Sequence, residues 1–113
     1  MTTVTFEKDG HGSYKGFTCF GHAGFAKKRF GKTEPDILCA AISALTANVI
    51  NGLSEIAGEK LTVTENEETG FIRCIFESEL KESSVLLVDS YVLSLSEYAK
   101  QYSKNLTVNF KEV

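Results

Sequence analysis

Cys39 and His22 are the two residues of this chain whose chemistry and placement suggest a reactive site. A thiol paired with an imidazole is the minimum needed for a cysteine nucleophile and its general base. Cys39 stands at the start of a long uncharged stretch, and His22 lies in a Gly-His-Ala-Gly segment upstream of it. The sequence therefore suggests nucleophilic catalysis, provided that the two side chains meet in the folded protein.

The position of Cys39 favours reactivity. Asp36 is predicted to cap a helix that starts at residue 37, because its carboxylate can accept a hydrogen bond from a first-turn amide. Cys39 would then be the third helical residue, where unpaired amides and the positive end of the helix dipole favour a thiolate. The same amides, including that of Cys39, could hold a developing oxyanion. Asp36 has a second possible role, which is to orient the imidazole.

The other two thiols are predicted to be structural. Cys19 lies between aromatic residues in one strand pattern, and Cys74 lies on the apolar face of another. Free cysteine is among the residue types most often buried, so burial is the default for both. Ser43 is one helical turn beyond Cys39 and could either line the site or bond a carbonyl of its own helix.

His22 is one of only two histidines in the chain. It follows a strand and is flanked by Gly21 and Gly24, which permit close backbone approach and unusual dihedral angles. Such a position can aim a side chain from a strand end into a cleft, although a surface histidine at the start of a loop is the simpler interpretation. His11 lies in a glycine-flanked turn and is expected to be exposed.

The elements that would position these residues follow a ββαββαβ order. Alternating or turn-bounded apolar segments predict strands over 1–8, 14–20, 61–64, 71–77 and 106–110. Helical spacing predicts helices over 37–57 and 81–103, the first with a core stripe that runs from Leu38 to Ile56. We expect one α+β domain over 1–113, with a small mixed or antiparallel sheet and both helices on one face.

Composition excludes several classes of protein. The net charge of −3 argues against direct nucleic-acid binding, since such domains usually carry a basic excess. The uncharged segment 37–54 approaches the length of a membrane span, but its interior serine, threonine, asparagine and glycine favour a core helix. The N-terminus has no signal-peptide pattern, and an odd number of cysteines favours reduced thiols, so we expect a cytoplasmic protein.

Two other functions remain open. One histidine and one cysteine without a CxxC or HxxxH pair fall short of a zinc site, so we expect neither a metal nor a cofactor. The segment 24–35 is rich in lysine and glycine and is long for a connector. It could dock on RNA or an acidic surface, which would make the chain a binding module rather than an enzyme. A small dimeric structural domain is the third possibility.

The combination of Gly21-His22-Ala23 with a D-x-x-C-A-x-x-S pattern from Asp36 to Ser43 resembles the ribosomal-processing cysteine protease family, Prp. The resemblance covers nearly the whole chain. It implies an endopeptidase with a Cys-His dyad, in which Cys39 is the nucleophile and His22 the general base. Gly21, Asp36 and Ser43 fall on the family's motif as supporting residues.

The same resemblance implies a substrate and an assembly state. Family members remove a short N-terminal extension from large-subunit ribosomal protein L-twenty-seven, cutting after a pair of phenylalanines, and the partner implied here is that precursor. They are typically cytoplasmic homodimers with a mobile loop near the site, and the segment 24–35 matches that loop in position. These remain expectations of the resemblance.

Overall fold

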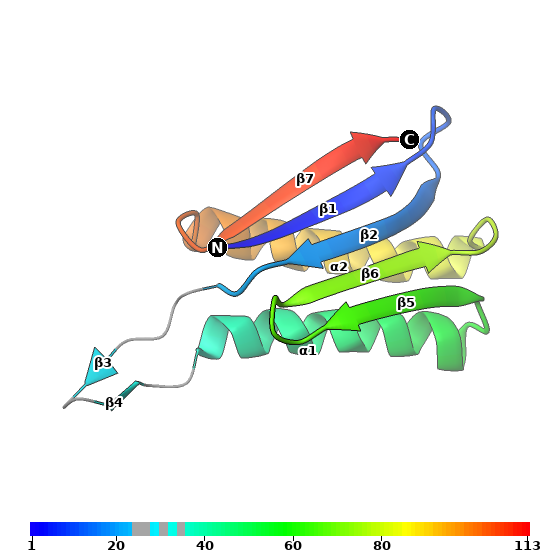
Figure 1. The fold of residues 1–113 in the computed structure, drawn as a ribbon. Coiled ribbons are helices and arrows are strands. Elements are labelled where there is room, and N and C mark those ends of the chain that lie inside the picture. The colour runs from blue at the N-terminus through cyan, green and yellow to red at the C-terminus, as the bar shows by residue number, and fades with distance from the viewer. Residues whose placement is uncertain (24–27, 30–31, 34–35) are drawn as a thin grey trace.

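The computed structural model describes residues 1–23, 28–29, 32–33 and 36–113, and within them five strands form one mixed sheet (Figure 1). The strands are β1 (Thr2–Lys8), β2 (Tyr14–Phe20), β5 (Leu61–Asn66), β6 (Phe71–Phe76) and β7 (Leu106–Glu112). Their spatial order is β5-β6-β2-β1-β7. Only β1 and β7 pair in parallel, and the other neighbours are antiparallel.

Two helices cover one face of this sheet, as the sequence predicts (Figure 1). Helix α1 (Ile37–Asn51) connects β2 to β5, and helix α2 (Glu82–Gln101) connects β6 to β7. Strands β1 and β2 form a hairpin, and β5 and β6 form another. The α+β class and the ββαββαβ order of the main elements are therefore confirmed. Two further strands, β3 (Lys28–Arg29) and β4 (Lys32–Thr33), pair within a segment for which the sequence predicts no strand.

The core lies between the helices and the sheet. Its largest fully buried side chains come from β1, β2, the helical turn that follows α1, α2 and the start of β7. They are Phe6, Phe17, Leu53, Leu95 and Leu106. The helical stretch Ile37–Ile56, which includes α1, is long and apolar enough to cross a membrane. Its buried side chains belong to this core, in agreement with the core helix predicted from the sequence.

The first helix ends differently from the prediction. A π-helical segment, η1 (Gly52–Ile56), continues α1 before the chain turns at Ala57. The wider turn of a π-helix rotates later residues out of the α-helical register. Leu53 is fully buried whereas Ile56, the predicted end of the core stripe, is 87% exposed. The prediction for Ile56 is therefore wrong.

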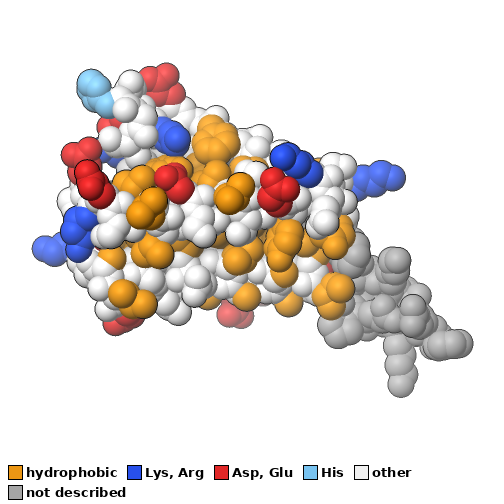
Figure 2. Space-filling view, turned by 180° about the vertical axis from the view of Figure 1, so that it is seen from behind, with side chains coloured by type: hydrophobic (Ala, Val, Ile, Leu, Met, Phe, Trp, Pro, Cys, Tyr) orange, Lys and Arg blue, Asp and Glu red, His pale blue; other side chains and the backbone are white. Residues whose placement is uncertain are grey.

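The helix side of the molecule keeps apolar groups in contact with solvent. Figure 2 shows hydrophobic side chains spread over this face. The exposed ones on the helices include Ile37, Ile56, Leu86 and Leu93. Contiguous exposed apolar surface on a small domain often marks an interaction site.

The ends of all five strands that lie nearest the start of α1 form one end of the sheet, which we call the site edge. Strands β1, β6 and β7 begin there, and β2 and β5 end there. The α1 N-terminus lies at the same end (Figure 1). Residues that are far apart in the sequence are therefore brought together at this edge.

Candidate active site

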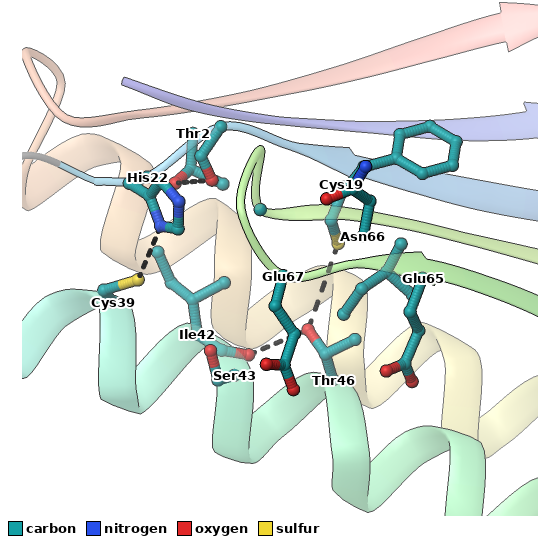
Figure 3. A pocket seen from close by; sticks show the side chains of 14 residues that line it. Thr2, Cys19, His22, Cys39, Ile42, Ser43, Thr46, Glu65, Asn66 and Glu67 are labelled. Atoms are coloured by element: carbon teal, nitrogen blue, oxygen red, sulfur yellow. Dashed lines mark hydrogen bonds between the residues drawn. The ribbon is translucent and has the colours of Figure 1, made fainter.

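Cys39 and His22 meet at the site edge. The Sγ atom of Cys39, in the first turn of α1, lies 3.9 Å from Nδ1 of His22, which follows β2. Figure 3 shows the imidazole above the helix start with its Nδ1 edge turned toward the thiol. In enzymes without bound substrate such contacts are often long and tighten when substrate binds. The structure therefore brings together the two side chains on whose meeting the predicted chemistry depends.

The hydrogen bond at the second ring nitrogen of His22 determines which of the two nitrogens carries the proton. Its Nε2 atom lies 3.1 Å from the main-chain carbonyl oxygen of Glu68. A carbonyl oxygen can only accept, so Nε2 must be the protonated nitrogen of the neutral ring. The lone pair is then on Nδ1, which faces the Cys39 thiol. This is the tautomer that a general base acting on Cys39 requires.

The backbone around His22 is fixed on both sides. Gly21 has φ +92°, and a side chain there would collide with the main-chain oxygen of Met1. This left-handed conformation and close approach account for a glycine at this position. The Gly21 amide donates to the Thr69 carbonyl at 3.2 Å, and the Asn105 side-chain amide donates to the buried Ala23 carbonyl at 2.9 Å. His22 therefore leaves a strand end that is held by two other segments.

Asp36 is the helix cap. Its Oδ1 atom accepts the Cys39 amide at 2.9 Å, and its carbonyl accepts the Ala40 amide at 3.0 Å. Such a cap contributes about 1 kcal/mol to a helix. The cap, one of the two roles considered for Asp36, is present in the structure, and the Glu68 carbonyl accepts a hydrogen bond from the imidazole. Because the Cys39 amide already donates to this cap, it is not free to bind an oxyanion, and the expectation that it would do so is corrected.

A cavity of about 250 Å³ opens beside Cys39 and His22. It lies between α1 and the β5–β6 hairpin, and both Cys39 and His22 line it (Figure 3). Ser43 also lines it, which is the first of the two roles considered for this residue. The remaining lining side chains are mixed in character and include Ile42, Thr46, Glu65, Glu67, Phe71 and Ile72. An extended peptide could therefore place one apolar side chain next to the thiol.

The inner end of the cavity contains a buried hydrogen-bonded cluster. Thr46 Oγ1 lies 2.7 Å from the Tyr91 hydroxyl and donates to the Ile42 carbonyl at 2.8 Å. Cys19 Sγ lies 3.4 Å from the same tyrosine hydroxyl. Burial raises the pKa of the Tyr91 hydroxyl, so it stays protonated and acts as a donor at neutral pH. The cluster ties β2, α1 and α2 together beneath the site.

The three thiols differ in accessibility, as the sequence predicts. Cys19 and Cys74 are buried, whereas Cys39 is partly exposed. Burial raises the pKa of the Cys19 thiol and, with a smaller effect of nearby Cys19, raises the pKa of Cys74 to about 12. Since neutral pH lies below both values, these two residues remain uncharged thiols.

We therefore expect iodoacetamide to alkylate Cys39 in the native protein at neutral pH. Cys19 and Cys74 should react at least tenfold more slowly, because burial and a raised pKa both suppress the reaction of a thiol. Each pKa unit lowers the thiolate fraction roughly tenfold. Peptide mass mapping after short exposure measures this. Denatured protein is the control, in which all three should react alike. Equal labelling of the three thiols in the native state would contradict the assignment.

The sequence predicts a turn over 65–70, between β5 and β6, but does not indicate that this turn belongs to the site. This turn supplies the carbonyl that orients His22, and Asn66, Glu67 and Gly70 line the cavity. The turn composition is visible in the sequence, but nothing local indicates that it meets a histidine 46 residues away. His11 lies exposed in the β1–β2 turn at the opposite end of the sheet, as expected. The basic segment 24–35, on which the binding-module hypothesis rests, lies largely outside the described residues.

Comparison with known proteins identifies the family of this chain. A family model described as "Cysteine protease Prp" matches residues 1–107. The Ribosomal processing cysteine protease Prp of Bacillus subtilis (strain 168) is 24% identical over 112 residues, which is 96% of each chain.

Solved structures show the same fold. The essential ribosomal processing protease Prp of Staphylococcus aureus, solved with a covalently linked product peptide, superposes with a TM-score of 0.84 at 22% identity. The match covers 98% of this chain and 100% of the other. The same S. aureus protein with a substrate peptide gives a TM-score of 0.82 at 21% identity, with the same coverage.

Proposed function

The chain belongs to the Prp family of cysteine proteases, and we propose that it removes the N-terminal extension of ribosomal protein L-twenty-seven by cutting after a Phe-Phe pair. The observation that carries the proposal is the 3.9 Å approach of Cys39 Sγ to His22 Nδ1 beside a cavity. The B. subtilis relative is named a ribosomal processing protease, which supports the substrate class.

The proposed reaction proceeds through an acyl-enzyme. His22 Nδ1 takes the Cys39 thiol proton, and Sγ attacks the scissile carbonyl carbon. The imidazolium then gives that proton to the leaving amine as the C–N bond breaks, which leaves a thioester on Cys39. Water next gives a proton to Nδ1 and attacks the thioester, and the C–S bond breaks to release the product acid. The imidazolium returns its proton to Sγ, which restores the thiol, and the product acid ionises to a carboxylate by losing a proton to solvent.

The cavity beside the dyad is the proposed site for a substrate aromatic side chain. Ile42, Phe71 and Ile72 supply apolar surface, and Cys39 lies at one end of the same cavity. An aromatic ring buried there would place the peptide bond that follows it near Sγ. Burial of an aromatic side chain contributes roughly 2 kcal/mol or more to binding, which is enough to select for the motif.

The proposal also places the protein in the cytoplasm as a homodimer, as its resemblance to the family implies. Three unpaired cysteines support a reducing compartment, and the exposed apolar side chains of the helices support a partner surface. Sedimentation velocity tests the second point, and a purely monomeric protein at micromolar concentration would contradict it.

A synthetic peptide that spans a Phe-Phe cleavage motif tests the function. We expect the wild-type protein to convert it into two fragments separated after the second phenylalanine, as read by mass spectrometry. Replacement of the two phenylalanines by alanine should lower kcat/KM by roughly tenfold or more, because the ring that occupies the cavity is lost from binding. Equal cleavage of both peptides, or no cleavage of either, would contradict the proposal.

A further inference from the structure

The turn between β5 and β6 contacts His22 more extensively than any other turn in the described part of the chain. We propose that this turn, residues 66–70, positions the catalytic base, and that the Asn66 side chain organises it. The inference rests on the proposed function insofar as His22 acts on Cys39. It adds Asn66 as a positioning residue, which acts through the Glu68–Thr69 peptide group.

A single peptide group links Asn66 to the imidazole. The carbonyl of Glu68 accepts from His22 Nε2 at 3.1 Å. The amide of Thr69, at the other end of that same peptide group, donates to Asn66 Oδ1 at 3.5 Å, and the Glu68 amide donates to the same oxygen at 3.1 Å. The orientation of the carbonyl is thus set by an Asx turn that the Asn66 side chain closes.

The turn also packs on the backbone that carries His22. The Thr69 carbonyl accepts the Gly21 amide at 3.2 Å. Gly70 has φ +67°, and an added Cβ there would lie 2.5 Å from the Gly21 oxygen and 3.2 Å from His22 Cε1. No other residue type fits without moving either the turn or the ring. The ring and the chain that holds it therefore leave no room for a side chain at position 70.

These contacts determine the state of the base. With Nε2–H directed at the Glu68 carbonyl, the neutral ring keeps its Nδ1 lone pair on the thiol side. After proton transfer the same carbonyl stabilises the imidazolium through a charge-assisted hydrogen bond. Loss of the turn geometry would let the ring rotate or change tautomer, and both changes remove the acceptor that faces Cys39.

The turn also lies in the wall of the substrate cavity. Asn66, Glu67 and Gly70 line it together with His22 and Cys39. A peptide bound in the cavity therefore contacts the same five-residue turn that holds the base. Substrate binding would restrict this exposed turn and thereby the imidazole, which links occupancy of the cavity to readiness of the dyad.

The test compares Asn66→Ala with Asn66→Asp, which keeps an Oδ1 acceptor for the two turn amides. Thr64→Ala is the matched control, because Thr64 is exposed on the same strand, two residues away, and does not line the cavity. Nitrogen-15 spectra of the wild type should show His22 as the Nε2–H tautomer. Exposed His11 is the internal reference for an unconstrained tautomer mixture.

We expect Asn66→Ala to shift His22 toward a mixture of tautomers and to lower kcat roughly tenfold with little change in KM. The magnitude is set by analogy with metal-bound histidines, where loss of the orienting partner costs about 10- to 100-fold. Alkylation of Cys39 at neutral pH should slow by a similar factor. Asn66→Asp should restore most of each quantity, and Thr64→Ala should leave all three unchanged. A loss of cavity contacts alone would raise KM and leave the tautomer and the alkylation rate as in the wild type.

The outcomes separate this inference from the proposed function. If Asn66→Ala cleaves the Phe-Phe peptide at the wild-type kcat with an unchanged His22 spectrum, then the positioning role is wrong while the protease assignment stands. A wild-type Nδ1–H tautomer would also overturn it. If the tautomer and alkylation rates respond as expected but no peptide is cut by the wild type, then the proposed substrate is wrong and the positioning role stands.

Discussion

A Cys39→Ala protein is expected to cleave the Phe-Phe peptide more slowly than the wild type by on the order of 10⁴-fold or more, as found when the nucleophile of a catalytic dyad or triad is removed. The reason is the geometry of the site edge. Cys39 is the one thiol near a base, since Cys74 is fully buried in β6 and Cys19 hydrogen-bonds in the core. Discontinuous assay by mass spectrometry, with excess enzyme and long incubation, measures the residual rate.

Cys74→Ala is the matched control for this experiment. It removes the same thiol from the same molecule, but at a position that is 0% exposed and on the core face of the sheet. We expect an unchanged kcat/KM and a small decrease in the free energy of unfolding. Normal cleavage by Cys39→Ala, or loss of cleavage in a folded Cys74→Ala protein, would show that the nucleophile has been assigned to the wrong residue.

Phe6→Ala is expected to lower the free energy of unfolding by about 3–5 kcal/mol, which is the usual cost of removing a buried phenylalanine. Phe6 is fully buried on β1, between β2 and β7. Its ring contacts those of Phe17 at 5.9 Å and Tyr91 at 5.6 Å between centroids. A small domain has only roughly 5–15 kcal/mol of stability in total, so this variant should be close to unfolding. Urea denaturation followed by circular dichroism gives the value.

Phe110→Ala provides the comparison for Phe6→Ala. The two rings stack at 5.8 Å, but Phe110 lies on edge strand β7 and is 56% exposed. Its truncation removes the same atoms while it exposes less surface and leaves no closed cavity. We expect a loss below about 1.5 kcal/mol, in line with a half-exposed side chain. Equal losses for the two variants would mean that the core is not centred on β1.

Local sequence signals were sufficient for the elements and for the position of Cys39. Alternation of apolar residues predicts β1 and β2, and the Asp36 cap followed by an uncharged segment predicts the start of α1. The structure places these where the patterns indicate. The pairing of Cys39 with His22 needed more, because it depends on the end of β2 and the start of α1 lying at the same end of the sheet.

Long-range contacts and helix irregularity were not predictable in this way. The contact between Glu68 and His22 joins segments 46 residues apart, and it involves a main-chain carbonyl that every residue carries. The π-helical segment after α1 has no clear sequence signal, yet it moves Ile56 out of the core. The predicted cap already implies that the Cys39 amide donates to Asp36. The same N–H group therefore cannot also bind an oxyanion while the cap is formed.

The supports of His22 have a consequence for biosynthesis. The histidine is held from residue 68 through its ring, and the neighbouring Ala23 is held from residue 105, which is 82 positions further along the chain. Contacts of such sequence separation form late, because loop closure must precede them. A ribosome-bound nascent chain that carries both Cys39 and His22 thus still lacks the support from Asn105 until that residue and β7 have emerged. We therefore expect full proteolytic activity only after β7 has been made and has paired with β1.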